Sequence, residues 1–315
     1  MVHEGQAKSA GGDFGFSITI KNQKSRIHNR PSSIGRPKGG RSAEEEKESV
    51  KGFLLAVQFL TIIPVSVKGE VTQRDMARSA AFFPLAGALQ GVIGAFAALI
   101  AARLFPPTIA GGLVLFVLTI VNGGFHLDAL ADTFDAIAVK STGDGAQDRQ
   151  KRLSVMKDSA TGAIGVTAIV MALLLKYLFI SPLFAKYGTW GAAYLLFLMP
   201  VFSKWAIMPA LFHGQPAASG GLGRIFIEGM DGRTYLLSWL FLAVVALTAT
   251  WLCPSPSLTA GINFLFLPCL CLYAFGLLWA FFCSRKFGGL TGDTIGAAAE
   301  IADLLFLAIA FLCFS

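Results

Sequence analysis

The chain has 315 residues, of which 54% are hydrophobic and only 14% are charged, whereas an ordinary soluble domain has about 25% charged residues. This deficit excludes a typical soluble globular domain. The net charge is +7, but Lys and Arg are not clustered between polar and aromatic positions, so we expect no nucleic-acid partner. The five cysteines lie within or beside apolar stretches and show no repeated CxxC pattern, which argues against a thiolate metal site and a disulfide framework.

Residues 1–50 differ in composition from the rest of the chain. They are rich in Gly, Ser, Lys and Arg, end in the acidic run 44–48, and show no sustained apolar periodicity. We therefore predict a disordered basic N-terminal extension. No apolar core follows a basic start, so the segment is not a recognisable secretory signal. Residues 51–315 are predicted to form a single membrane-embedded catalytic domain.

Apolar stretches dominate the chain from Gly52 onward. A membrane-spanning helix needs about 20 mostly apolar residues. Seven stretches come close to this length: 82–104, 111–127, 162–182, 189–209, 235–253, 262–283 and 297–314. The predicted fold class is therefore all-α, a polytopic integral membrane protein with about seven transmembrane helices. Segment 53–67 is also apolar but short, with Pro64 near its end, and it fits a re-entrant or interfacial helix as well as an eighth span.

Charges between these stretches predict their orientation, because Lys and Arg in short loops collect on the cytoplasmic side. Three loops carry only one charge between them, that of Lys186: 105–110, 183–188 and 253–261. Nearly all other charges lie in the N-terminal tail and in three further loops: 128–161, 210–234 and 284–296. We therefore expect a multi-pass protein of the cell inner membrane, surrounded by lipid, whose polar loops face the cytoplasm.

The first polar motif follows directly on an apolar stretch. Asp128, Asp132 and Asp135 are spaced by four and three residues, so a helix would present all three carboxylates on one face. Such like charges repel each other, and hard oxygen ligands favour Mg²⁺, with Mn²⁺ as the alternative. A solvated loop helix is the structural alternative. His126 lies on another part of the helix and fits a general base, a substrate contact or a simple interfacial histidine.

The second motif lies at residues 149–159, just before Gly162 and Gly165. Asp158 and Ser159 stand where a helix N-cap belongs, and the free amides there favour an anion. Together with Lys157 they are predicted to bind a substrate phosphate. The other basic residues of the motif are more simply explained as anchors of the cytoplasmic side.

Two glycine-rich segments complete the polar motifs. Glycine-rich turns before a helix let backbone amides approach a phosphate closely, and guanidinium groups can bind phosphate through two hydrogen bonds. The predicted substrate-binding residues in these segments are Gly221, Gly223, Arg224, Arg233, Gly288, Gly289 and Gly292.

Carboxylates also occur on the last predicted span. Asp293, Glu300 and Asp303 share one helical face, and carboxylates inside a membrane helix are costly unless they are paired. Glu300 and Asp303 are therefore functional candidates, or else they pair with Lys204 or another buried cation. Lys204 either reaches a substrate phosphate or extends to the lipid headgroups, whereas Lys176 is expected only to extend to the headgroups.

The motifs together combine carboxylates suited to a metal with glycines and basic groups suited to phosphates. The sequence contains no Gly-x-Ser-x-Gly nucleophile motif. This combination predicts phosphoryl transfer to an alcohol, in which a base assists the incoming hydroxyl.

Four runs carry a resemblance to a known family: 123–135 (GGFHLDALADTFD), 155–165 (VMKDSATGAIG), 221–233 (GLGRIFIEGMDGR) and 288–300 (GGLTGDTIGAAAE). In this order, and with 59–65 as an opening motif, they resemble the cobalamin synthase family, the adenosylcobinamide-GDP ribazoletransferases, over about residues 51–315. The sequence departs from the family pattern at five positions, which puts some substrate contacts in doubt: Ile62, Ala129, Ala136, Ala160 and Lys204.

The resemblance implies a Mg²⁺-dependent membrane enzyme that acts late in nucleotide-loop assembly. It would join adenosylcobinamide-GDP to α-ribazole or its 5′-phosphate, giving adenosylcobalamin or its 5′-phosphate and GMP. The resemblance implies that Asp128, Asp132 and Asp135 bind the metal. We infer that His126 transfers a proton. Supporting contacts with the metal or the substrate are inferred for Asp158, Asp293 and Glu300. Association with other corrinoid-pathway enzymes fits this role.

Two other functions remain as alternatives. A membrane phosphotransferase of the CDP-alcohol type also uses aspartates on a helix to bind metals. Only the three motifs other than the aspartate motif distinguish it from a ribazoletransferase. A corrinoid transporter is disfavoured, because transporters more often place ionisable groups near the bilayer midplane.

Overall fold

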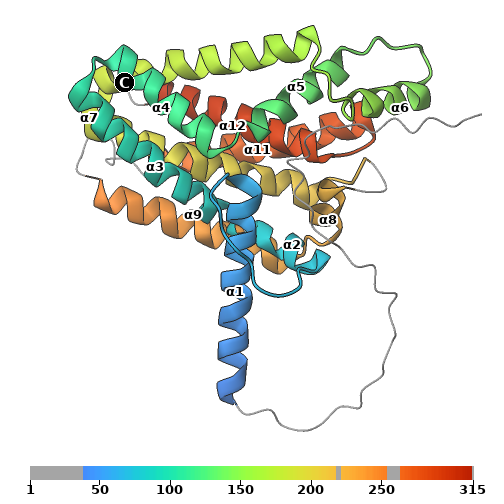
Figure 1. Ribbon diagram of the computed structural model, residues 1–315, viewed down its shortest axis with the longest axis horizontal. Helices are drawn as coiled ribbons and strands as arrows, with labels where there is room; N and C mark the ends of the chain where they lie inside the picture. Colours follow the sequence, from blue (N-terminus) through green and yellow to red (C-terminus); the bar gives the residue numbers. More distant parts are fainter. Residues whose placement is uncertain (1–37, 218–220, 254–262, 314–315) are drawn as a thin grey trace, which may run out of the picture. The chain divides into compact units, whose positions relative to one another are not determined.

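Helices make up nearly all of the regular structure in the computed structural model, which describes residues 38–217, 221–253 and 263–313. The expectation of an all-α fold is confirmed for these residues (Figure 1). The elements in chain order are α1 (Lys38–Leu60), α2 (Gln73–Ser79), the 3₁₀ helix η1 (Ala80–Phe82), α3 (Phe83–Leu104), α4 (Pro107–Val121), α5 (Phe125–Ala138), α6 (Gly145–Val155), α7 (Ala163–His213), α8 (Leu222–Glu228), α9 (Gly232–Leu252), α11 (Asn263–Phe287) and α12 (Gly292–Cys313).

The longest helix, α7, lies at the centre of the packing. It contacts α3, α4, α5, α9, α11 and α12, and its second part contributes Phe202 and Trp205 to the fully buried core. α7 has 51 residues, but Gly188 has φ 68° and ψ 175°, which is not helical. The chain turns back at this residue (Figure 1). Each of the two segments, 163–187 and 189–213, is about 37 Å long at 1.5 Å per residue, enough to cross a bilayer.

Among the described residues, five helical stretches are long and apolar enough to cross a membrane: Gln73–Leu104, Ala163–His213, Gly232–Leu252, Leu265–Phe287 and Gly292–Leu312. A sixth arises if α4 and α5, which meet at an angle of 86°, count as one broken span. The predicted spans 162–182 and 189–209 correspond to the two segments of α7, which are separate helical stretches on either side of the non-helical Gly188.

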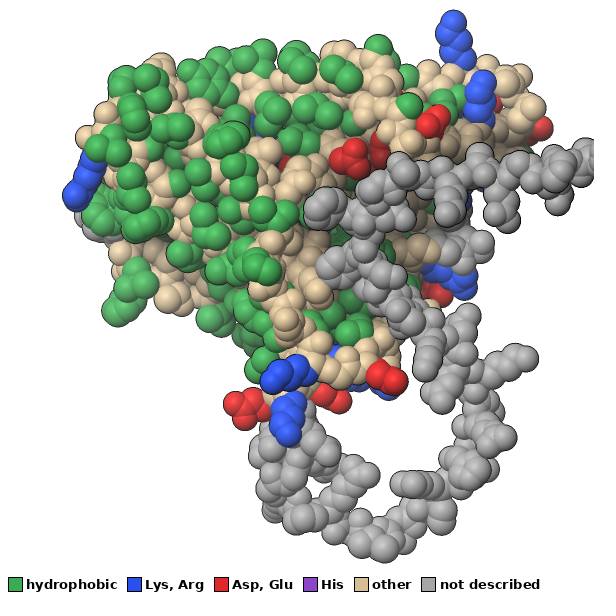
Figure 2. Space-filling view, in the orientation of Figure 1, with side chains coloured by type: hydrophobic (Ala, Val, Ile, Leu, Met, Phe, Trp, Pro, Cys, Tyr) green, Lys and Arg blue, Asp and Glu red, His purple; other side chains and the backbone are tan. Residues whose placement is uncertain are grey.

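Large apolar side chains cover much of the surface over α3, α9 and α11 (Figure 2). Phe96 is 64% exposed, Leu236 is 68% exposed and Trp251 is 82% exposed. A monomeric soluble protein rarely exposes such a large contiguous apolar area. These faces are suited to lipid, which agrees with a polytopic membrane protein.

Helix α1 corrects the predicted boundary of the N-terminal extension. It begins at Lys38, so 38–50 is helical rather than disordered, while 1–37 lies outside the described residues. Ala, Glu and Lys in this stretch are strong helix formers, and Lys51 pairs with Asp75 of α2 at 2.7 Å. The helix ends at Leu60 and is not among the candidate spans, so segment 53–67 does not form an eighth span.

Candidate functional site

Three motifs that are far apart in the sequence meet around one cavity of about 140 Å³. The end of α6 and its following turn provide one wall, the start of α8 the second, and the start of α12 the third. The lining residues are Leu153, Met156, Lys157, Gly221, Gly223, Arg224, Leu290, Thr291, Gly292 and Asp293. The prediction that these polar loops lie on the same side of the helices thus agrees with the structure.

The turn before α12 is held by backbone pairing with the segment that follows α7. Leu290 donates to the Gln215 carbonyl at 2.7 Å, and Ala217 donates to the Leu290 carbonyl at 2.9 Å. Gly289 has φ 154°, and a Cβ there would overlap the Gln215 carbonyl oxygen. Gly288 and Gly289 were predicted to bind substrate. Neither lines the cavity; Gly289 allows this close backbone approach, and Gly288 adopts a positive φ of 84°.

The starts of α8 and α12 lie directly against each other. A Cβ on Gly223 would be 2.8 Å from the Gly292 nitrogen, so only glycine allows the two backbones to approach this closely. Arg224, on the same turn of α8, pairs with Glu228 at 2.7 Å and also lines the cavity. Backbone amides at the start of α12 and the side chains of Lys157 and Arg224 therefore surround one space, which suits an anion.

The aspartate helix α5 packs against the first part of α12. Gly123 and Gly124, with φ 65° and 71°, allow the sharp bend that separates α5 from α4. Asp132 experiences the negative charges of Asp128, Asp135 and Asp293. The predicted carboxylates of the first and third motifs are therefore close enough to repel each other.

Asp135 makes contacts that the metal role suggested by the spacing did not predict. Its Oδ2 accepts a hydrogen bond from the Gly162 amide at 2.6 Å, and its Oδ1 accepts one from the Gly165 amide at 2.8 Å. A Cβ on Gly162 would be 2.5 Å from this carboxylate. Asp135 thus caps the start of α7 from another helix, and the two glycines in the sequence were the signal that could have revealed it.

The residues predicted to cap α7 do not do so. Asp158 accepts a hydrogen bond from the Ala160 amide at 3.1 Å, within its own turn, and Ser159 is exposed. α7 begins at Ala163, too far along the chain for either side chain to cap it. Neither residue lines the cavity, and neither does the exposed Arg233.

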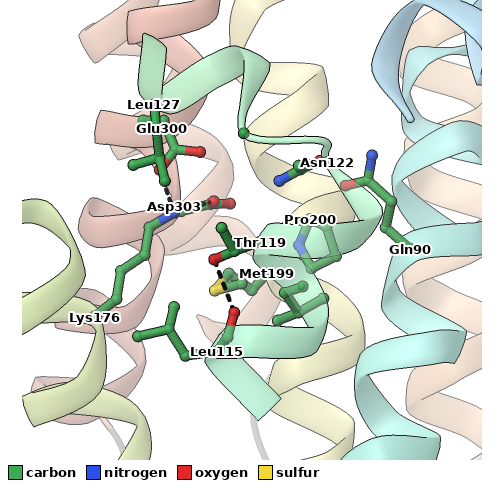
Figure 3. Close-up of a pocket in the computed structure, with 12 residues that line it drawn as sticks. Gln90, Leu115, Thr119, Asn122, Leu127, Lys176, Met199, Pro200, Glu300 and Asp303 are labelled. Carbon is green, nitrogen blue, oxygen red and sulfur yellow. Dashed lines mark hydrogen bonds and ion pairs between the residues drawn. The ribbon is translucent and has the colours of Figure 1, made fainter. Parts of the chain in front are cut away.

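Glu300 belongs to a buried ion cluster rather than to the carboxylates at the cavity. Lys176 binds Glu300 at 2.5 Å and Asp303 at 2.7 Å, and all three side chains are buried (Figure 3). This arrangement does not support the metal role predicted for Glu300, because its charge is compensated by a lysine. The alternative of pairing with a buried cation is confirmed, but the cation is Lys176 rather than Lys204. Lys176 does not extend to the headgroups.

His126 and Lys204 lie together in the interior. Lys204 Nζ is 3.3 Å from His126 Nδ1, and Lys204 is 0% exposed while His126 is 7% exposed. Lys204 therefore neither reaches the headgroups nor lines the cavity, so its predicted substrate contact is corrected to a contact with His126.

The expected Mg²⁺ site can be compared with the side chains that could act as metal ligands. No group of three or more His, Cys, Asp or Glu side chains among the described residues is arranged to hold a metal ion. Mg²⁺, however, usually binds through one or two carboxylates together with substrate phosphates and water. Asp128, Asp132 and Asp293 supply hard oxygen donors, and in the described ranges none of them has an ion-pair partner. Their chemistry fits Mg²⁺ bound jointly with a phosphate.

Comparison with known proteins gives the same family as the four motifs. Residues 52–311 match the family described as cobalamin-5-phosphate synthase. Three similar curated proteins, each called adenosylcobinamide-GDP ribazoletransferase, come from different bacteria. The protein of Thermodesulfovibrio yellowstonii is 36% identical over 84% of this chain and 96% of its own length. That of Clostridium tetani is 29% identical over 84% and 98%, and that of Geotalea daltonii is 33% identical over 81% and 94%.

No solved structure matches this chain. The family match nevertheless covers nearly all of the described residues and includes every wall of the cavity. The chain belongs to the cobalamin-5-phosphate synthase family.

Proposed function

We propose that this protein transfers the cobinamide phosphate of adenosylcobinamide-GDP to α-ribazole or its 5′-phosphate. The products are adenosylcobalamin or its 5′-phosphate, and GMP. The names of the curated relatives support this activity. The observation that carries it is the cavity in which Lys157, Arg224, the start of α12 and Asp293 come together.

The cavity residues have distinct tasks in this reaction. Lys157, Arg224 and the amides at the start of α12 bind the two phosphates of the donor, because cations and helix N-termini favour anions. The ribazole hydroxyl oxygen forms a bond to the phosphorus on the cobinamide side. The bond from that phosphorus to the bridging oxygen breaks, the hydroxyl proton passes to solvent, and the bridging oxygen leaves with GMP.

Asp128, Asp132 and Asp293 would hold Mg²⁺, or Mn²⁺ in its place. When bound, the ion neutralises charge on the phosphates. The three carboxylates lie on two helices, α5 and α12, so the relative position of these helices decides whether the donor and the ion fit together.

The orientation in the membrane follows from the side on which the cavity lies. The loops that form it hold most of the charges between the apolar helices, and positively charged loops remain on the cytoplasmic side. We place the cavity at the cytoplasmic face of the cell membrane, where nucleotide-activated substrates are available.

Turnover in proteoliposomes tests the proposal. The purified protein is given adenosylcobinamide-GDP, α-ribazole and Mg²⁺, and we expect GMP release. A CDP-alcohol donor replaces the corrinoid donor in a parallel reaction, and sealed vesicles report transport. Activity with the CDP-alcohol alone would identify a different phosphotransferase, and corrinoid uptake without GMP release would identify a transporter. Either result would contradict the proposal.

A further inference from the structure

A second, smaller cavity lies between the helices, and its lining residues differ from those of the candidate site. It has a volume of about 10 Å³ and is formed by α3, α4, α5, α7 and α12 (Figure 3). The polar side chains that line it are Gln90, Thr119, Asn122, Lys176, Glu300 and Asp303. A polar space of about 10–15 Å³ is enough to hold one water molecule.

Two oxygen atoms at this cavity have no hydrogen-bond donor among the described residues. They are Oδ1 of Asn122 and Oδ1 of Asp303, in side chains that are 9% and 2% exposed. Asp303 Oδ2, in contrast, binds Lys176 at 2.7 Å. The hydroxyl of Ser203, which also interacts with Asp303, donates to the Pro200 carbonyl at 3.3 Å. Because a buried acceptor without a donor is costly, we expect a further donor beside these two oxygens.

Two uncharged side chains at the cavity that could donate are bonded to the backbone instead. The Gln90 amide donates to the Leu60 carbonyl at 2.8 Å, and the Thr119 hydroxyl donates to the Leu115 carbonyl at 2.9 Å. Within the described ranges, neither side chain donates to the two oxygens. The missing donor must therefore come from a bound molecule.

A water molecule matches this arrangement better than a metal cation does. It has two hydrogens, one for each oxygen, and its own oxygen can accept a third hydrogen bond. Lys176 can donate that bond, because an ammonium group has three N–H donors and two of them are engaged with Glu300 and Asp303. Three hydrogen bonds are typical of a buried water. A metal cation would instead be repelled by the positive charge of Lys176.

We propose that one water molecule is bound in this cavity and joins Asn122, at the bend between α4 and α5, to Asp303 of α12 and Lys176 of α7. Asn122 is the last residue before Gly123 and Gly124, where α4 and α5 meet at 86°. The water thereby fixes the start of α5, the aspartate helix, relative to α12. Its consequence for turnover rests on the proposed function, in which α5 and α12 together hold the ion.

A crystal structure of the full-length protein, grown from a lipid phase and resolved well enough to show water, tests the site without turnover. We expect one density peak at about 2.6–3.2 Å from Asn122, Asp303 and Lys176, the distances of hydrogen bonds. An empty cavity would overturn the proposal. So would a peak with shorter contacts to more than three oxygens, which is the coordination of a metal cation.

Two variants separate the bound water from general packing. Asn122→Leu removes one acceptor and fills part of the space, so we expect the density peak to be lost and kcat to fall by up to about 100-fold with little change in KM. Thr119→Val is the matched control. It removes a hydroxyl of the same cavity that bonds within its own helix, and it should keep both the peak and the turnover. Full turnover of Asn122→Leu, or loss of the peak in Thr119→Val, would contradict the proposal.

The result is also separable from the proposed function. If the wild type releases no GMP but the peak lies on its three partners, the water site stands and the proposed reaction fails. If GMP is released and the cavity is empty, the reaction stands and this inference fails. The wild-type structure decides the site even if Asn122→Leu does not fold.

Discussion

Helix α12 carries two kinds of carboxylate within about three turns, and their surroundings differ. Glu300 and Asp303 are buried and bound to Lys176 at 2.5 and 2.7 Å. Asp293 lies at the cavity, near Asp128 and Asp132, and these three have no ion-pair partner in the described ranges. Carboxylates that are already compensated hold the helices together, whereas those left without a cation are the ones available to a ligand.

Removing one of the uncompensated carboxylates should have the largest effect on turnover. We expect Asp132→Asn to lower GMP release by at least about 100-fold, because it removes charge that would stabilise the bound ion and phosphates. Its folding should be preserved, since the substitution relieves repulsion between like charges. Normal turnover of Asp132→Asn in proteoliposomes would exclude this carboxylate from the site.

Breaking the compensated cluster should instead affect stability. Lys176→Met leaves two buried carboxylates without a cation, so we expect the free energy of unfolding to fall by about 3–5 kcal/mol. Unfolding in detergent, followed by circular dichroism, measures this decrease. A triple variant in which Glu300 and Asp303 are also neutralised, Lys176→Met with Glu300→Gln and Asp303→Asn, should recover part of the lost stability. A stable Lys176→Met protein would show that the cluster contributes nothing.

Asp135 gives a third case, a carboxylate compensated by backbone amides. Asp135→Asn replaces one acceptor by an amide donor that faces the N–H of Gly162 or Gly165. We expect the free energy of unfolding, measured by circular dichroism in detergent, to fall by about 1–2 kcal/mol. Asp158→Asn is the matched control, because its carboxylate is exposed. Equal stability of the two variants would contradict the capping role of Asp135.

A local effect is expected at Asp148, which accepts hydrogen bonds from neutral donors and lies 3.9 Å from Arg152. Hydrogen bonds from the Ser141 hydroxyl and the Thr142 amide lower its pKa from 3.8 to about 2. Its stabilising contribution should therefore be complete above pH 3.8 and fade as the pH falls toward 2. Hydrogen exchange of residues 141–148 between pH 5 and 2 measures this change, and Asp148→Asn should remove the pH dependence. The same pH dependence in the variant would rule out Asp148 as its source.

The apolar helices and the meeting of the polar motifs could be predicted from the sequence. Hydropathy alone marks the spans, and charged loops on one side bring Lys157, Gly223 and Asp293 together. The pairing of individual side chains could not be predicted, since it depends on how helices rotate against one another. Lys176 was assigned to the lipid headgroups for this reason, although its partners lie on α12.

The capping of α7 illustrates the same limit at the level of hydrogen bonds. Local spacing favoured Asp158 as the cap, but the carboxylate that binds the start of the helix comes from Asp135, 27 residues before Gly162. Similarly, the apolar run around Gly188 was expected to contain a loop, whereas one non-helical residue suffices for the change of direction.

Binding of Mn²⁺ tests the central distinction between the two kinds of carboxylate most directly. Electron paramagnetic resonance can count the bound ion in nanodiscs that contain the protein and adenosylcobinamide-GDP, independently of turnover. We predict that Asp132→Asn weakens Mn²⁺ binding by at least about 10-fold, whereas Glu300→Gln leaves it unchanged. Unchanged binding in Asp132→Asn, or an equal loss in Glu300→Gln, would contradict the assignment of the metal to the uncompensated carboxylates.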